Sequence, residues 1–199
     1  MKRFVIIWIC ILLLITSFSL GCIEDDGEKD EPLKEFHITF QEQRLDAFNI
    51  TGYTNDSEVT EIVKTFSQFN ITKIKLYLKW IDDCKYFADC FGNVNYTDDA
   101  LDKFNLTVID PTQYSIGDES IYELIFINIT VNDIPQDQTI NATSEKQVVD
   151  QFITDNRIGN WQFNITCVEA RGGQMFRDRG NDWMLVVDVY HYEGIILEP

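Results

Sequence analysis

The residues best suited to chemistry in this sequence are five aspartates that flank predicted strands. Asp82 and Asp83 follow one strand, Asp98 and Asp99 precede the next, and Asp182 lies in the turn before the last. Calcium takes about six to eight oxygen ligands, which clustered aspartates and loop carbonyl groups supply. Aspartate also favours turns because its side chain bonds to nearby backbone. A calcium site and a purely structural role therefore stay open as alternatives.

Three cysteines of the region after the N-terminal segment suggest structural roles. Cys84 and Cys90 enclose a short loop, and export would place them where disulfides form. Closing such a loop stabilises a fold by roughly 2 kcal/mol. A metal site is the alternative, but the spacing matches no zinc pattern and no histidine lies nearby. We predict a disulfide between Cys84 and Cys90, and a buried, non-nucleophilic thiol at Cys167.

Catalytic machinery is not evident in the sequence. His37 and His191 are the only histidines, and they lie far apart in strand-like contexts. We find no nucleophile elbow, phosphate-binding loop or metalloprotease helix. The sequence therefore predicts a protein that is not an enzyme and that holds no cofactor, calcium excepted.

The net charge limits the partners of the chain. The formal net charge is −17, and removal of residues 1–21 would take away two basic residues and no acidic one. Such a surface repels phosphate backbones, so nucleic acid is not an expected partner. It also repels anionic lipid headgroups, so attachment to a membrane needs a dedicated anchor.

The N-terminal segment supplies such an anchor. Two basic residues precede an unbroken apolar run at 4–15, and small residues follow, which are the three parts of an export signal. Counting through Leu20 makes an uncleaved anchor helix the alternative. Under the positive-inside rule, both interpretations place the rest of the chain outside the cell membrane.

The end of this segment resembles the lipobox of prokaryotic membrane lipoproteins. Gly21 and Cys22 match that pattern, whereas Ser19 stands where an aliphatic residue is usual. The resemblance implies that Cys22 is the first mature residue and the lipid attachment site. Ordinary cleavage with release is the remaining alternative.

Asparagine sequons are numerous. Attached glycans would be bulky and exposed, although the alternation of polar and apolar residues in strands produces the same pattern. With the lipobox-like signal they are typical of an archaeal cell surface. The candidate glycosylation sites are Asn49, Asn55, Asn70, Asn95, Asn105, Asn128, Asn141 and Asn164.

Strands dominate the rest of the chain. The strictest alternation, at 72–81, buries Ile74, Leu76, Leu78 and Trp80. The run 121–131 is apolar on both faces near its centre, which predicts a central strand. Segment 57–69 has helical spacing but strand-like composition, which favours a strand. Further strands are expected at 36–40, 103–109, 161–168 and 183–189.

One helix is expected after Ser144. Ser144 to Gln147 fits a capping box, and Val148, Val149, Phe152 and Ile153 would then share one helical face.

These segments give the expected organisation: a signal peptide or anchor helix at 1–21, an acidic tether at 22–35 and a β ectodomain at 36–199. Short strands joined by turns predict a mostly β, jelly-roll-like β-sandwich with one short helix. The segments 69–83, 104–111 and 159–166 resemble β-sandwich domains of the pre-peptidase C-terminal and convertase P-domain kind. That resemblance implies a non-catalytic accessory module and carries over no active site.

We therefore expect a lipid-anchored protein of the extracellular face whose domain binds or has a structural role. A surface protein or a glycan is the expected partner class. A ligand-binding component of a transporter or sensor is the alternative, and a secreted hydrolase is a third.

Overall fold

The structure, a computed structural model, describes residues 32–81, 101–170 and 180–197. The predicted signal or anchor segment, Cys22 and the acidic tether up to residue 31 lie outside these ranges. No helix among the described residues has the length and hydropathy needed to cross a membrane. The elements of the compact unit that begins at Lys34 are β1 (Lys34–Asn55), β2 (Val59–Phe66), β3 (Ile71–Trp80), β4 (Lys103–Ile109), β5 (Ser115–Ser120), β6 (Leu124–Thr130), β7 (Gln138–Ala142), α3 (Glu145–Asp150), β8 (Gly159–Glu169) and β9 (Gly180–Leu197).

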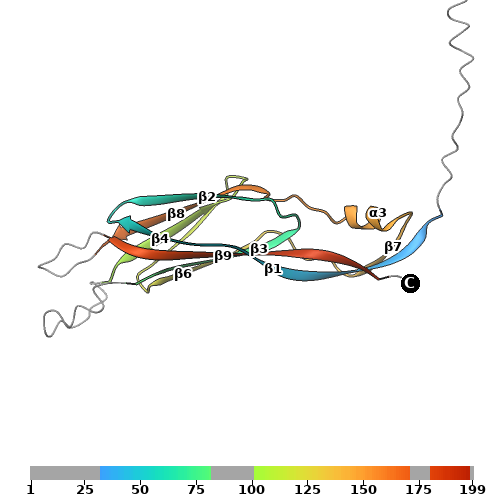
Figure 1. The fold of residues 1–199 in the computed structure, drawn as a ribbon, viewed down its shortest axis with the longest axis horizontal. Coiled ribbons are helices and arrows are strands. Elements are labelled where there is room, and N and C mark those ends of the chain that lie inside the picture. Colours follow the sequence, from blue (N-terminus) through green and yellow to red (C-terminus); the bar gives the residue numbers. More distant parts are fainter. Residues whose placement is uncertain (1–31, 82–100, 171–179, 198–199) are drawn as a thin grey trace, which may run out of the picture. The chain divides into compact units, whose positions relative to one another are not determined.

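The strands form two antiparallel sheets (Figure 1). One has the order β6-β3-β9-β1-β7 and the other β2-β8-β4-β5. Four of the pairings are nested: β1 pairs with β9, β2 with β8, β3 with β6 and β4 with β5. Three further pairings, β3 with β9, β4 with β8 and β1 with β7, complete the two sheets. The chain is therefore arranged like one long hairpin that has been rolled into two layers.

The inner faces of the two sheets share one apolar core. Trp161, Phe163 and Phe104 are completely buried in it. The predicted alternation of 72–81 is confirmed, since Ile74, Leu76, Leu78 and Trp80 all point inward in β3. Burial of such side chains stabilises a fold by about 1.5–3 kcal/mol each.

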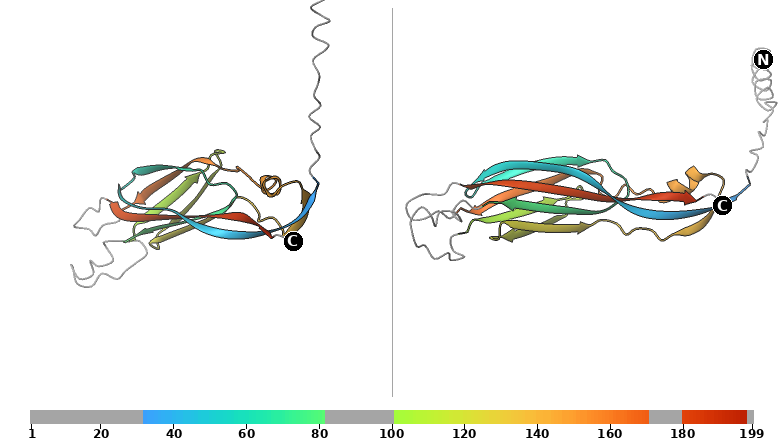
Figure 2. Two further views of the ribbon diagram at one scale, coloured as in Figure 1. Left: turned by 45° about the vertical axis from the view of Figure 1, so that its right-hand side comes forward. Right: turned by 60° about the horizontal axis from the view of Figure 1, so that its bottom comes forward.

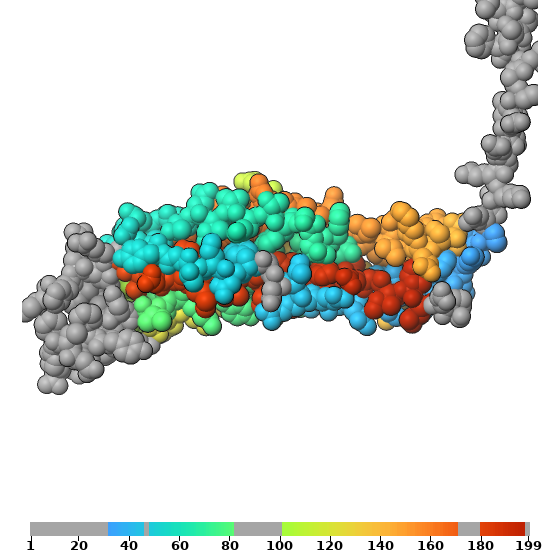
Figure 3. All heavy atoms as spheres, viewed as in Figure 1, coloured from blue at the N-terminus to red at the C-terminus, as the bar shows by residue number. Residues whose placement is uncertain are grey.

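A long two-stranded ribbon extends this body. β1 has 22 residues, a length of about 70 Å, and it pairs with β9 from His37 to Asn55. The two strands twist around each other (Figure 2), and β9 reaches the surface along much of their length (Figure 3, red). The predicted strand at 36–40 is therefore only the start of β1.

A second small core lies at the far end of the ribbon. Phe36 and Ile38 pack there with Ala142 of β7 and Val148 of α3. On β9, Leu185 and Val189 belong to the main core whereas Ile196 packs into the second. Because successive side chains of a strand point to opposite faces, the two cores lie on opposite faces of β9. In β1, the register shift between Asp46 and Phe48 reverses the face to which alternate side chains point, so that this strand also contributes to both cores.

Two predictions are wrong in detail. The run 121–131 forms β6, which is an edge strand and not a central one, so its outward residues Leu124 and Phe126 are 45% and 46% exposed. The helix ends at Asp150, before Phe152 and Ile153, and the predicted apolar face does not form: within the helix Val148 is buried but Val149 is exposed, and Ile153 beyond it is exposed as well. The strand preferred for 57–69 is confirmed as β2.

Helix α3 begins as its capping sequence predicts. The Ser144 hydroxyl accepts a hydrogen bond from the Gln147 backbone N–H, and Val148 is completely buried. The Gln147 side chain reaches back to the N–H of Thr143, not to that of Ser144. Both contacts satisfy backbone donors at the start of the helix.

Candidate functional site

Half of the predicted site residues fall outside the described ranges. These are the proposed lipid site Cys22, the proposed disulfide partners Cys84 and Cys90, the sequon Asn95, and the aspartates Asp82, Asp83, Asp98 and Asp99. Asp182 is described, and it lies exposed near the start of β9. In ranges 32–81, 101–170 and 180–197, no three His, Cys, Asp or Glu side chains are grouped as a metal ion requires. The disulfide and calcium site stay predictions.

Cys167 and the two histidines lie in structural surroundings. Cys167 is completely buried among the core side chains of β8, as its inward position predicts. His37 is exposed, and its Nδ1 lies 3.3 Å from the Thr139 hydroxyl. His191 is buried, and its Nδ1 lies 3.2 Å from the Gln68 amide nitrogen. The two histidines lie at different places along β1 and β9, so they do not form a common site.

The described sequons are divided among different surfaces. Asn105 and Asn164 lie side by side on the outer face of the four-stranded sheet, each opposite the threonine of the other sequon. Asn128 lies on the outer face of β6. Asn70 is different, because its carboxamide accepts from the Thr154 N–H at 2.8 Å and donates to the Tyr192 carbonyl. The other described candidates, Asn49, Asn55 and Asn141, are exposed.

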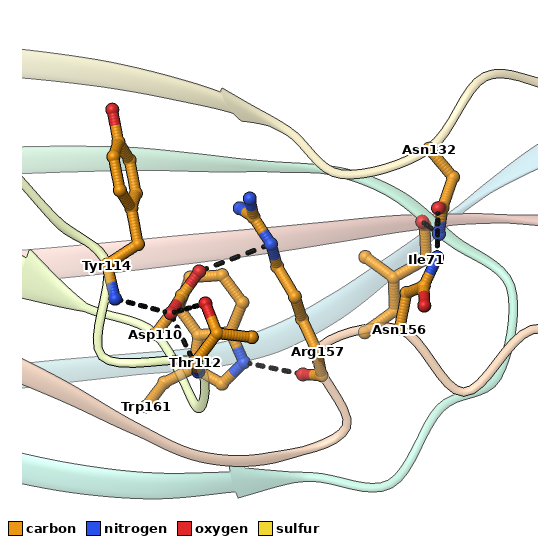
Figure 4. A network of polar contacts seen from close by, with 8 residues as sticks. All are labelled: Ile71, Asp110, Thr112, Tyr114, Asn132, Asn156, Arg157 and Trp161. Atoms are coloured by element: carbon orange, nitrogen blue, oxygen red, sulfur yellow. Dashed lines mark hydrogen bonds and ion pairs between the residues drawn. The ribbon is translucent and has the colours of Figure 1, made fainter.

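A polar network around Asp110 joins the end of β4 to the start of β8 (Figure 4). One carboxylate oxygen of Asp110 accepts from the N–H groups of Thr112 and Tyr114, at 2.8 and 2.9 Å, and from the Thr112 hydroxyl. The other oxygen lies 3.2 Å from Arg157 Nε, a contact that is an ion pair without hydrogen-bond geometry. The Arg157 carbonyl accepts from the Trp161 indole at 3.0 Å.

This network has a structural explanation. The saturated carboxylate oxygen fixes the turn that follows β4, as aspartate commonly does. Arg157 has a φ of 61°, and its carbonyl satisfies the indole of a completely buried Trp161. Every member thus has a role in holding the turn or the core, and the arrangement offers no separate reactive group.

A different kind of surface covers the outer side of β3 and β6. We call it the β3–β6 face and define it by Lys73, Lys75, Tyr77 and Lys79 of β3 and by Leu124, Phe126, Asn128 and Thr130 of β6. The register places Lys79 beside Leu124, Tyr77 beside Phe126, and Lys75 beside Asn128. A column of cationic side chains therefore lies against a column that begins with two exposed apolar ones.

The aromatic pair fixes the centre of this face. The rings of Tyr77 and Phe126 lie 4.9 Å apart with an interplanar angle of 32°. On the other side of β3, Met184 and Val186 of β9 are partly exposed in the same two rows. At the end of the face near Leu124, apolar side chains therefore extend across β6, β3 and β9, while the lysines form a cationic column along β3.

The lysines differ in their partners. Lys73 forms a 2.5 Å ion pair with Glu42, and its Nζ lies 4.7 Å from the centre of the Tyr190 ring. Burial raises the pKa of Glu42, but hydrogen bonds from Lys73 and Thr72, together with the positive charges of Lys73 and Lys75, outweigh burial and hold that pKa below its usual value of 4.5. Lys75 lies 5.0 Å from the same ring. Within the part of the chain that the structure describes, no acidic side chain forms an ion pair with Lys75 or Lys79.

The chemistry of this face suits binding. Lys75 and Lys79, which form no ion pair within the described ranges, attract anions. The tilted aromatic pair of Tyr77 and Phe126 and the exposed Leu124 attract apolar groups. The sequence shows the lysines and the tyrosine on one face of 72–81. For 121–131, however, it predicts a central strand with both faces buried, whereas the face with Leu124 and Phe126 is exposed. The signal that could have revealed the face is that 121–131 carries apolar residues on both sides.

Comparisons with known proteins identify no family. The chain matches no protein family and no curated protein. Among the solved structures that the chain matches is one of FLHE, with 8% identity, a TM-score of 0.30, and coverage of 77% of this chain and 96% of the other. Another is of Desmodium yellow mottle tymovirus, with 9% identity, a TM-score of 0.32, and coverage of 81% and 91%.

Proposed function

We propose that the protein is a non-catalytic binding module attached to the outer side of the cell membrane, and that its β3–β6 face contacts the partner. The observation that carries this proposal is the pairing of exposed Leu124 and Phe126 with Lys75 and Lys79. An uncharged, seven-residue edge strand with exposed apolar side chains is a liability for an isolated protein, so its presence favours a role in contact.

The finer fold assignment supports this reading. The nested pairing of the strands favours a jelly-roll-like β-sandwich, in which the two outer faces are available to partners. The basic start, the apolar run and the lipobox-like end support export and lipid attachment at Cys22. The sequons support glycosylation of an exported chain.

Site-specific photo-crosslinking in intact cells tests the proposed contact. Phe126 is replaced by p-benzoylphenylalanine in the full chain, and Val63 serves as the matched control position. Val63 is 50% exposed and lies on the outer face of the other sheet. We expect a discrete crosslinked product from position 126 that disappears when Lys75 and Lys79 are replaced by glutamate.

The outcomes separate contact from chance encounter. Equal products from positions 126 and 63, or a product from 126 that ignores the lysine replacements, would refute the proposed face. The anchor is tested separately with Cys22→Ser, which should leave an unlipidated precursor of altered mobility. A peptide running from Met1 through Ile23 in wild-type membranes would instead support the uncleaved helix.

A further inference from the structure

The free edge of β6 differs from the other sheet edges of the described residues. The edges are β6 and β7 in the five-stranded sheet, and β2 and β5 in the four-stranded sheet. β5 contains Gly117, Asp118 and Glu119, β2 contains Glu61 and Lys64, and β7 has only five residues. β6 has seven residues with no charge, glycine or proline.

Those differences matter because edge strands present unpaired backbone groups. Proteins usually protect such edges with charges, prolines, bulges or short strands. β6 has none of these, and its pairing with β3 runs from Leu124 to Thr130 without a register shift. It is therefore a regular template onto which another extended chain can add.

The lysine column indicates the charge of the added chain. Neighbouring strands lie about 4.8 Å apart, so a strand added to β6 would lie roughly 10 Å from β3. Long lysine and glutamate side chains on the same face bridge that separation across β6. Lys75 lies opposite Asp188 of β9, which is paired with Arg44, and its charge also attracts Glu42, whereas Lys79 lies opposite Met184. The chain as a whole has a net charge of −17, so Lys75 and Lys79, which form no ion pair among the described residues, are a local cationic exception that attracts acid.

A second copy of this chain does not provide that complement. If β6 paired with β6 of another copy, cationic columns would lie on both sides of the new pair, with no acidic side chain of either β6 facing them. Two bodies that each carry a large negative charge would also repel each other. The charge pattern thus favours a different protein as the occupant.

Resting on the proposed function, we infer that β6 receives an extended segment of a partner protein by strand addition. That segment alternates acidic side chains, which face Lys75 and Lys79, with apolar ones. Main-chain hydrogen bonds to β6 provide the affinity, and the β3–β6 face provides the selection for acidic sequence.

Selection from random peptides tests the partner chemistry. The full-length protein in detergent is presented with a phage-displayed library of short random peptides. We expect enrichment of sequences in which Glu or Asp alternates with Val, Ile or Phe. The best selected peptide should lose at least about tenfold in affinity for the variant with Lys75→Glu and Lys79→Glu. Exchange of its acids for lysine should restore binding to that variant, which shows that the variant is folded.

Backbone methylation distinguishes strand addition from contact with the face alone. Only every second amide of an added strand points at β6. N-methylation of one alternating set should therefore abolish binding, whereas methylation of the other set should leave it within a fewfold.

Three results would overturn strand addition: no enrichment of acidic peptides, enrichment without alternation, or equal tolerance of both methylated sets. The first result would leave the face to a glycan-like or lipid-like ligand, and the last would mean that the peptide binds through its side chains. If the crosslink at position 126 persists alongside any of these, the proposed binding function stands and only strand addition fails.

Discussion

The outer faces of the two sheets are built from the same strand alternation but with different chemistry. On the four-stranded sheet, Asn105 and Thr107 of β4 lie beside Thr166 and Asn164 of β8, so two sequons interlock on one surface. On the five-stranded sheet, the corresponding positions of β3 and β6 carry lysine, aromatic and aliphatic side chains. The first surface is suited to solvent or glycans, and the second to a partner.

The edges of the two sheets repeat this difference. β2 also exposes apolar side chains, Val59 and Val63, but Glu61 lies between them on the same face. β6 has no such charge between Leu124 and Phe126. The charged residues Glu61 and Lys64 therefore distinguish β2 from the uncharged edge β6, which can accept a chain.

The largest expected effect separates the two sides of β6. Ile127 is 5% exposed and belongs to the main core, whereas its neighbour Phe126 is 46% exposed. Ile127→Ala should lower the free energy of unfolding by about 2–5 kcal/mol. Phe126→Ala should change it by less than about 1 kcal/mol. Urea denaturation of the full chain in detergent measures both, and similar losses would mean that Phe126 is part of the core.

Removal of the charge on β2 should convert a protected edge into an exposed one. In Glu61→Val, three outward valines would follow one another at Val59, position 61 and Val63. We expect concentration-dependent association, measured by light scattering, while Glu61→Gln stays closer to wild type because glutamine is polar. A fully monomeric valine variant would contradict the role assigned to Glu61.

The sequons allow the two faces to be compared by modification. Thr107→Ala and Thr166→Ala should each remove one glycan from the four-stranded sheet and leave the crosslink at position 126 unchanged. Thr130→Ala removes the sequon of Asn128, which lies within the β3–β6 face. Intact mass of the protein from its native host measures occupancy. Full occupancy of Asn128 would contradict a docking face, because a glycan there would cover it.

The smallest expected effect is the pH dependence of the Glu42–Lys73 pair. The pKa of Glu42 is lower in the folded protein than its usual 4.5, so its contribution to stability is present above that value. The contribution is lost as the pH falls through the lowered pKa. Glu42→Gln should flatten the stability profile in that acidic range, and Lys73→Met should reduce the same component. An unchanged slope in both variants would show that the pair is not coupled to folding.

The sequence by itself determined which residues point inward. Alternation of polar and apolar side chains is a local property of an extended chain, so the inner faces of β3, β4 and β8 were predictable, as was the start of α3 at Ser144. Composition also favoured a strand for β2 correctly. The polar strands β5 and β7 were missed because their alternation is weak.

The order of the strands was decided by the tertiary structure alone. A strand with apolar residues on both faces is either a central strand that is buried on both sides or a strand with one exposed contact face. The local pattern of 121–131 is the same in both cases. The placement of β6 at an edge, beside the lysines of β3, depends on pairings between residues far apart in the chain. The same holds for the ribbon of β1 and β9, whose two cores lie on opposite faces of β9. A register shift near Asp46 reverses the alternation of β1, so that this strand contributes to both cores.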